Sequence, residues 1–272
     1  MNWRAIRAIV RKDLKVVFQN KGVSMPLIIV PIVIMGLLPA LAAFAPALEN
    51  IPGSPFAGMD TFLENMPAGL QTNLAGLNEM QTMIVLVLVY MLAPMYLIMP
   101  LMVSSVIAAD SFAGEKERKT LEALLYTPTT DRELILAKLL SPWLPAVVIA
   151  WGTFIIYSVI ANLAGWRVMG RVFFPNAMWV VLALWVAPAV AAMSLGVTVL
   201  VSARAETFQE AYQMGAMVVL PVILLVVGQA TGVMYFSVGL VLLLGLVMWI
   251  IAAALLWLGG RAFARNTLAT KL

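Results

Sequence analysis

The residues of this chain that could do chemistry are concentrated in one short charged stretch. It runs from Asp110 to Pro128 with the sequence Asp-Ser-Phe-Ala-Gly-Glu-Lys-Glu-Arg-Lys-Thr-Leu-Glu-Ala-Leu-Leu-Tyr-Thr-Pro. The chain around it is almost entirely apolar, and an apolar run of membrane-spanning length lies on each side. A charged, helix-forming segment in that position is suited to mechanical contact with a soluble partner.

The residue types of this chain give little support for covalent catalysis or metal binding. The chain has no cysteine and no histidine, which removes thiol nucleophiles, imidazole bases, disulfides and the usual zinc ligands. The run from Gly114 to Thr120 lacks the spacing of a phosphate-binding loop, and its bulky charged residues would not cradle phosphate. We therefore expect no catalytic, metal or cofactor site on this chain.

The composition places the chain in the membrane class. It has 272 residues, of which 63% are hydrophobic and 11% charged, and its mean hydropathy is +0.99. Soluble domains carry roughly 25% charged residues. The net charge of +4 does not indicate nucleic acid, because the basic residues flank apolar runs and are expected to anchor them to an anionic leaflet.

The apolar runs predict an all-α integral membrane protein with a single domain over residues 1–272. Six runs reach the roughly 20 residues that a bilayer requires. They cover Met25–Ala47, Thr82–Ala109, Leu139–Ala164, Met178–Ser202, Ala211–Ala230 and Met234–Leu258. The turn between the last two is very short, so one of that pair is either a plain crossing or a broken or re-entrant segment.

The basic residues give the orientation of the spans. Fifteen of the seventeen lie on one side of the predicted bundle, and only Arg167 and Arg171 lie on the other. The positive-inside rule then places both termini and the 110–138 loop in the cytoplasm. The loop Leu48–Gln81 falls outside, carries four acidic residues and no basic one, and is a candidate contact for an external protein.

The first 24 residues predict an amphipathic helix on the cytoplasmic membrane surface. Apolar and basic residues recur at helical spacing on two different faces. The apolar face has Trp3, Ile6, Val10, Leu14 and Val17, and the basic face has Arg4, Arg7, Arg11 and Lys15. An interfacial anchor is favoured, with contact to a cytosolic partner as the alternative. The long basic segment and the full-length first span are unlike a cleaved signal peptide, so we expect that span to be retained.

The charged stretch itself predicts two helices with a break between them. Over Glu115–Glu122, Glu115 would pair with Lys119 and Arg118 with Glu122, each four residues apart. Pro128 would end this helix, and Thr130 with Glu133 has the spacing of a capping box for a helix leading into the third span. The alternative is that this stretch only connects two spans and is exposed to solvent, as runs of charged residues usually are.

This stretch resembles the signature of ABC-2 type transporter permeases. The shared pattern is the acidic-basic-acidic run Glu115-Lys-Glu-Arg, then Thr120-Leu-Glu, a Thr127-Pro turn, and a helix ending in Lys138. The resemblance extends over most of the chain and is closest to prokaryotic sodium- and drug-efflux permeases. Lys119 departs from the pattern, because many relatives have glycine there, and we expect the lysine to make the helix firmer.

The resemblance implies a mechanism and a location. Two permease chains, alike or paralogous, would sit in the prokaryotic cytoplasmic membrane and would export cargo. Two separate cytosolic ATPase subunits would lie below them and would bind ATP and Mg²⁺. The helix after the second span would be a coupling helix seated in the ATPase. The candidate transmission residues are Glu115, Glu117, Arg118, Thr120, Leu121 and Glu122.

Two other functions remain open from the residues. The chain could be a mechanotransmission subunit that acts on an external partner through Leu48–Gln81 without moving cargo. It could also be a channel or carrier that needs no ATPase. No Asp, Glu, Lys or Arg falls inside the six predicted spans, which argues against an ion-coupled carrier.

Overall fold

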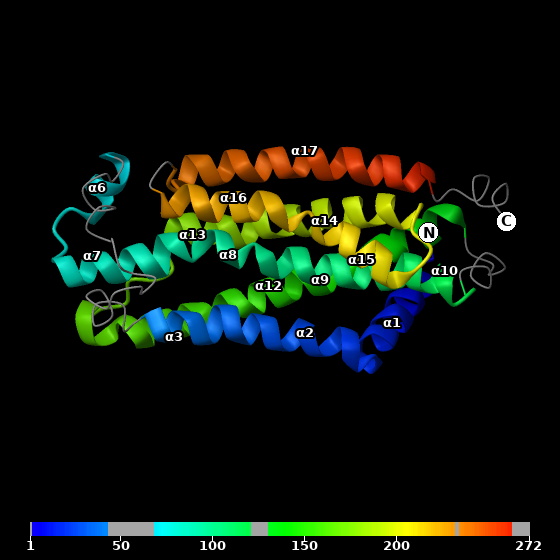
Figure 1. The fold of residues 1–272 in the computed structure, drawn as a ribbon, viewed down its shortest axis with the longest axis horizontal. Helices are drawn as coiled ribbons and strands as arrows, with labels where there is room; N and C mark the ends of the chain where they lie inside the picture. The colour runs from blue at the N-terminus through cyan, green and yellow to red at the C-terminus, as the bar shows by residue number, and fades with distance from the viewer. Residues whose placement is uncertain (1, 43–67, 121–129, 232–233, 263–272) are drawn as a thin grey trace.

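In a computed structural model, the chain folds into a bundle of helices that run along one axis (Figure 1). The structure describes residues 2–42, 68–120, 130–231 and 234–262. Within these ranges all regular structure is helical, and six helices are long and apolar enough to cross a membrane. They span Ser24–Leu41, Glu79–Glu117, Arg132–Met169, Ala177–Ser202, Phe208–Gln229 and Val238–Gly260. The predicted all-α architecture with six spans is thus confirmed.

Several of these spans are divided into consecutive segments, some of them π-helical. The first span contains α2 (Lys21–Ile32), η1 (Val33–Leu37) and α3 (Leu38–Ala42); the second contains α7 (Glu79–Val85), η2 (Leu86–Met91), α8 (Ala93–Tyr96), α9 (Ile98–Ala109), η3 (Asp110–Gly114) and α10 (Glu115–Glu117). The third is α12 (Asp131–Met169), and the fourth contains α13 (Ala177–Val181), η4 (Leu182–Val186) and α14 (Ala187–Ser202). The fifth contains α15 (Phe208–Ala216) and α16 (Val219–Ala230), and the sixth is α17 (Val238–Ala262).

The fifth span is broken but not re-entrant. Residues Met217 and Val218 separate α15 from α16, yet Figure 1 shows α15 at the end of the bundle near α10 and α16 continuing to the opposite end, near α13. The helix α17 then returns along the bundle. Of the alternatives left open by the short turn, the structure has two crossings, one of them interrupted midway.

Helix α12 begins where its capping box was predicted. The Thr130 side chain accepts a hydrogen bond from the Glu133 backbone N–H, and the Glu133 side chain accepts one from the Thr130 backbone N–H. The helix runs for 39 residues despite two internal prolines and ends at Met169, and the following Gly170 is left-handed with a φ of 60°. A left-handed residue at that position is the usual helix terminator.

The second and fourth spans form the centre of the bundle. The apolar windows of these two spans are 78% and 72% buried, whereas no other span exceeds 33%. Ser104 donates a hydrogen bond to the Ala191 carbonyl at 2.7 Å, and Ser194 donates one to the Leu101 carbonyl at 2.9 Å. Small hydroxyl residues allow close helix approach and bond across it, so α9 and α14 are held together by both packing and hydrogen bonds.

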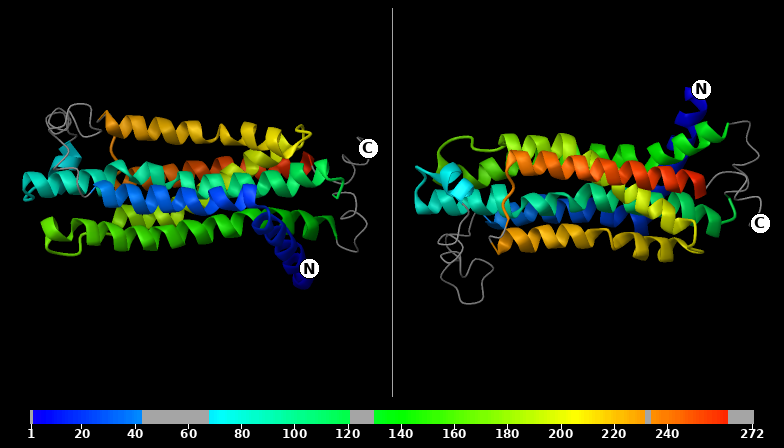
Figure 2. Two further views of the ribbon diagram at one scale, coloured as in Figure 1. Left: turned by 60° about the horizontal axis from the view of Figure 1, so that its bottom comes forward. Right: turned by 90° about the horizontal axis from the view of Figure 1, so that it is seen from above.

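Helix α1 (Trp3–Gln19) leaves the bundle at an angle and lies against the beginning of α12 (Figure 2). Its buried residues are Ile6, Ile9, Asp13 and Val17. Of the predicted apolar face, Ile6 and Val17 are buried against the protein and Trp3 is 63% exposed, so the position of Trp3 in the membrane interface stays a prediction. The face of α1 that packs against the rest of the protein therefore includes an aspartate, Asp13.

Candidate functional site

The charged segment after the second span ends its helix earlier than predicted. The α-helix stops at Glu117, and Arg118 to Thr120 form a turn. The Thr120 N–H donates to the Glu115 carbonyl at 2.9 Å, and the Lys119 N–H donates to the Lys116 carbonyl at 3.1 Å. These two bonds are those of a Schellman motif, which caps the last carbonyls of a helix. The prediction of one helix over Glu115–Glu122 is therefore wrong.

Lys119 is the left-handed residue of this motif. Its φ is 54°, a conformation that glycine adopts readily and residues with a Cβ adopt at a cost. The expectation that lysine makes the helix firmer here is thus also wrong, because the backbone leaves the helix at this residue. A glycine at this position suits the termination.

The ion pairs predicted along that helix are replaced by pairs between helices. Glu115 binds Lys12 of α1 and Lys138 of α12, instead of Lys119. Arg118 binds Asp110, eight residues before it, at 3.0 Å. Glu122, the predicted partner of Arg118, lies outside the described residues, as does Leu121.

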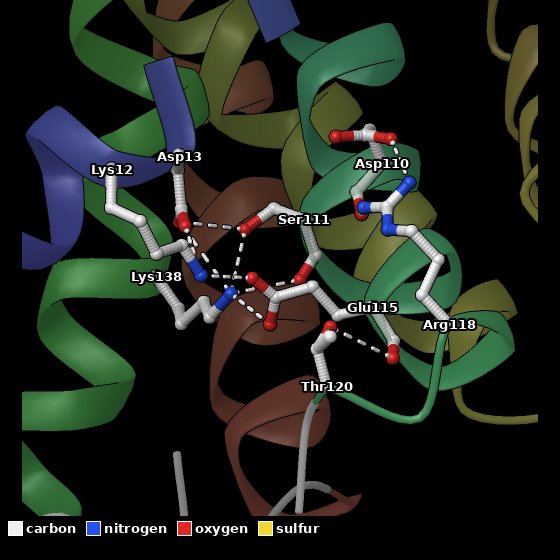
Figure 3. Close-up of polar contacts among 8 residues, drawn as sticks. All are labelled: Lys12, Asp13, Asp110, Ser111, Glu115, Arg118, Thr120 and Lys138. Atoms are coloured by element: carbon white, nitrogen blue, oxygen red, sulfur yellow. Dashed lines mark hydrogen bonds and ion pairs between the residues drawn. The ribbon is translucent and has the colours of Figure 1, made fainter. Parts of the chain in front are cut away.

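Four charged residues from three helices form one cluster, which we call the charge cluster: Lys12, Asp13, Glu115 and Lys138 (Figure 3). Lys138 Nζ lies 2.5 Å from Glu115 Oε2 and 3.5 Å from Asp13 Oδ2, and Lys12 Nζ lies 3.0 Å from Asp13 Oδ1. Two cations face two carboxylates, so the cluster is neutral. The side chains of Asp13, Glu115 and Lys138 are at most 5% exposed.

Ser111, in the π-helical segment η3, adds hydrogen bonds to two members of the cluster. Its hydroxyl donates to Asp13 Oδ2 at 2.9 Å, and its carbonyl accepts from Lys138 Nζ at 3.0 Å. Buried charges are tolerated only when they are both paired and hydrogen-bonded. Short π-helical segments are frequent at functional sites, and this one places Ser111 between the aspartate and the lysine.

The environment of Asp13 and Lys12 favours their charged forms. Burial by itself disfavours a charged Asp13 and is the largest single effect, but Lys138 and Lys12 together outweigh it and lower the pKa of Asp13. Burial likewise acts against a charged Lys12, and the hydrogen bond to Glu115 and the nearby Asp13 overcome it and raise the pKa of Lys12. Both residues therefore remain ionised at neutral pH.

The same segment is tied to the fifth span. Lys116 Nζ donates to the Ala205 carbonyl at 2.9 Å, and Glu117 Oε2 accepts from the Phe208 N–H at 2.8 Å. Phe208 is the first residue of α15, and a carboxylate at a helix N-terminus is stabilising because the N–H groups there lack partners. Residues 115–117 thus contact α1, α12 and the start of α15.

Glu133 makes a second link between α1 and α12. Besides capping its own helix, its Oε1 accepts a hydrogen bond from the Asn2 N–H at 2.5 Å. Asn2 is itself the N-cap of α1 and accepts from the Arg4 and Ala5 N–H groups. The two helices consequently begin at a shared carboxylate and pack together through Ile6, Ile9, Leu134 and Ala137.

The predicted site residues divide by exposure. Glu115 is buried, whereas Glu117, Arg118 and Thr120 are exposed. The structure adds partners that the sequence interpretation missed, namely Lys12, Asp13 and Ser111. One signal for Asp13 was available: it falls in register with the buried Ile6, Ile9 and Val17, and an acid on an apolar helix face requires a buried partner.

The arrangement connects several helices at one place. Within the described residues no group of three or more Asp and Glu side chains is placed to hold a metal ion. Residues 115–117 thus form a joint that is connected to α1, α12 and the start of α15 through charged and capping contacts.

Comparison with known proteins identifies the family of the chain. A model of the family described as ABC-2 family transporter protein matches residues 7–244. Searches of curated proteins and of solved structures gave no match. The family match covers most of the chain and includes all of the charge cluster, so the chain belongs to the ABC-2 transporter family, whose members are membrane components of ABC transporters.

Proposed function

We propose that this chain is the permease subunit of an ATP-driven exporter and that a separate cytosolic ATPase moves it through the 110–138 segment. The observation that carries the proposal is the joint at residues 115–117, which bonds to α1, α12 and α15 at one end of the bundle. A partner that displaced this joint would move several spans together.

The two kinds of site residue suggest a division of roles. The exposed Glu117, Arg118 and Thr120, with Leu121 and Glu122 beyond the described residues, would contact the ATPase. The buried Glu115 would pass the displacement to α1 and α12 through Lys12 and Lys138. Its role would be positional, since its charged neighbours leave it no free oxygen for an outside partner.

Further features of the proposal follow from the family resemblance and the charge distribution. The chain would act as a dimer with an identical or similar permease and lie in a prokaryotic cytoplasmic membrane with its basic end inside. Figure 1 is consistent with a single basic end, because α1, α10 and the start of α15 lie together, away from α6 (Ala68–Leu74) and α7. The outer loop Leu48–Gln81 would be available to an external protein.

Co-purification of the ATPase tests the proposal. The double variant Lys119→Glu/Arg132→Glu reverses two exposed charges beside the joint, and a glutamate at position 132 suits the N-terminus of α12. We expect wild type purified from native membranes in mild detergent to bring down an ATPase and the double variant to lose it. The control Arg167→Glu/Arg171→Glu reverses two exposed charges at the opposite end and should retain the ATPase. Equal recovery from both double variants would contradict docking at this segment.

A transport measurement separates export from the other functions. In inverted vesicles containing the chain and its ATPase, ATP-dependent uptake of cargo would support export. ATP hydrolysis without uptake of any cargo would favour mechanotransmission through the outer loop. Flux that persists in vesicles without any ATPase would favour a channel or carrier.

A further inference from the structure

A groove lined mostly by apolar residues lies between α1 and α12. It has a volume of about 560 Å³ and is lined by Trp3, Arg4, Ile6, Arg7, Val10, Leu140 and Leu144. Leu144 is 41% exposed and lies on the outer surface of the third span. The groove is thus continuous with the surface that a lipid chain would contact, and its size is within the range of small-ligand sites.

A basic hollow adjoins this groove. It has a volume of about 670 Å³ and is lined by Arg4, Arg7, Ala8, Arg11, Lys12 and Lys15. Arg4 and Arg7 line both the hollow and the groove. Every polar side chain that lines the hollow is a cation, and within the described part of the chain Arg4, Arg7 and Arg11 form no ion pair. These guanidinium groups are well suited to bind a phosphate diester.

The apolar groove and the basic hollow match the two halves of one kind of molecule. We propose that they bind one anionic glycerophospholipid, with its phosphate among Arg4, Arg7 and Arg11 and an acyl chain along Ile6, Val10, Leu140 and Leu144. An acidic peptide would account for the basic hollow but not for an apolar groove that opens onto a membrane span. The inference concerns this site alone and does not depend on the proposed export function.

The site lies next to the charge cluster. Lys12 lines the basic hollow and also binds Glu115 and Asp13. A phosphate in the hollow therefore attracts the same ammonium group that holds α1 to the second span. Bound lipid would act on the joint at residues 115–117 through Lys12, and would thereby affect how α1 is held to the second span.

Native mass spectrometry of the full chain in delipidated detergent micelles tests the proposal. We expect titration with phosphatidylglycerol to give one retained lipid per chain, and phosphatidylcholine with the same acyl chains to bind at least about tenfold more weakly, because each basic residue near an anionic lipid adds roughly a factor of five. The variant Arg4→Gln/Arg7→Gln should weaken phosphatidylglycerol by a similar factor. Equal binding of the two lipids would overturn the proposal.

The control variant Arg167→Gln/Arg171→Gln removes the same charge at the far end of the bundle. It should bind phosphatidylglycerol as wild type does. If it lost as much phosphatidylglycerol binding as Arg4→Gln/Arg7→Gln, the effect would be one of overall charge and not of a site. Glycerol phosphate, which carries the anionic group without acyl chains, should not displace the lipid at millimolar concentration. Displacement by glycerol phosphate would reject a lipid site in favour of a phosphate site. Because all four arginines are exposed, both variants should fold, and circular dichroism would verify this.

Discussion

Lys138 is the cation on which the charge cluster depends most, because it faces both buried carboxylates. Replacing it in Lys138→Met would leave Asp13 and Glu115 with Lys12 alone, and breaking a buried ion pair in this way costs about 3–5 kcal/mol. Adding Glu115→Gln restores neutrality and should recover much of the loss. Unfolding in mixed detergent and dodecyl sulfate micelles would measure both. The exposed Lys15→Met is the control, and an equal cost there would show that the cluster adds no stability.

The ionisation of Asp13 gives this stability a pH dependence. Its pKa in the folded chain is below the ordinary value of 3.8, because Lys138 and Lys12 outweigh the effect of burial. A lowered folded-state pKa means that the contribution is present above pH 3.8 and is lost as the pH falls through the lower value. Unfolding measured from pH 7 downwards should show an acid decline that is smaller in Asp13→Asn. Parallel declines would mean that Asp13 is not held in its charged form.

A substitution of Lys119 is expected to increase the stability of the chain rather than to decrease it. Its left-handed conformation costs a residue with a Cβ roughly 1–2 kcal/mol, part of which glycine loses again through its larger unfolded-state entropy. Lys119→Gly should therefore stabilise the chain by about 0.5–1 kcal/mol, and Lys119→Val should destabilise it. The control Lys116→Gly, within the preceding helix turn, should destabilise by about 1 kcal/mol through helix propensity and further through loss of the Lys116 hydrogen bond to the Ala205 carbonyl. A loss of stability in Lys119→Gly would contradict the observed chain reversal.

At the residue level, the sequence predicts the location of the charged site better than its pairings. The capping box of Thr130 and Glu133 is confirmed because it depends only on residues three apart. The pairs of Glu115 are not local: Lys12 lies 103 positions away and Lys138 lies 23 away. Spacing along one helix has no information about such contacts, and it misplaced them because the helix ends at Glu117.

At the level of elements, close packing between α14 and α17 depends on glycine. A Cβ added to Gly196 would lie 2.7 Å from the Leu255 Cβ and 3.4 Å from the Leu256 backbone nitrogen, so one helix would have to move. Gly196→Ala should destabilise by about 1–3 kcal/mol through overpacking. At Gly152 in α12 an added Cβ meets no atom within 4 Å, and Gly152→Ala should gain up to about 1 kcal/mol. Thermal unfolding in detergent would compare the two variants. Similar unfolding midpoints for Gly196→Ala and Gly152→Ala would argue against tight contact between α14 and α17.

The spans themselves follow from hydropathy, but their irregularities do not. The predicted and observed spans agree in number and differ mainly at their ends, because charged residues extend the second and third helices beyond the apolar runs. The π-helical segment η2 is a tertiary feature: Trp179 Nε1 donates to the Val89 carbonyl at 2.6 Å and the Tyr157 hydroxyl donates to the Leu88 carbonyl. These donors come from other helices, so the local sequence of the second span does not indicate them.

At the scale of the whole molecule, orientation can be tested cleanly because the chain has no cysteine. Single-cysteine variants Arg132→Cys and Arg171→Cys place a thiol at each end of α12, where both native side chains are exposed. A helix of 39 residues is about 58 Å long, well above the roughly 30 Å of bilayer hydrocarbon, so both thiols lie in water.

The distribution of basic residues, fifteen against two, predicts that the Arg132 end faces the cytoplasm. In intact cells a membrane-impermeant maleimide should therefore label Arg171→Cys but not Arg132→Cys, and permeabilisation should make both react. Labelling of Arg132→Cys from outside would reverse the orientation. The joint at residues 115–117 would then face away from any cytosolic ATPase, and the ATP-driven mechanism would fail whatever the internal contacts of the bundle.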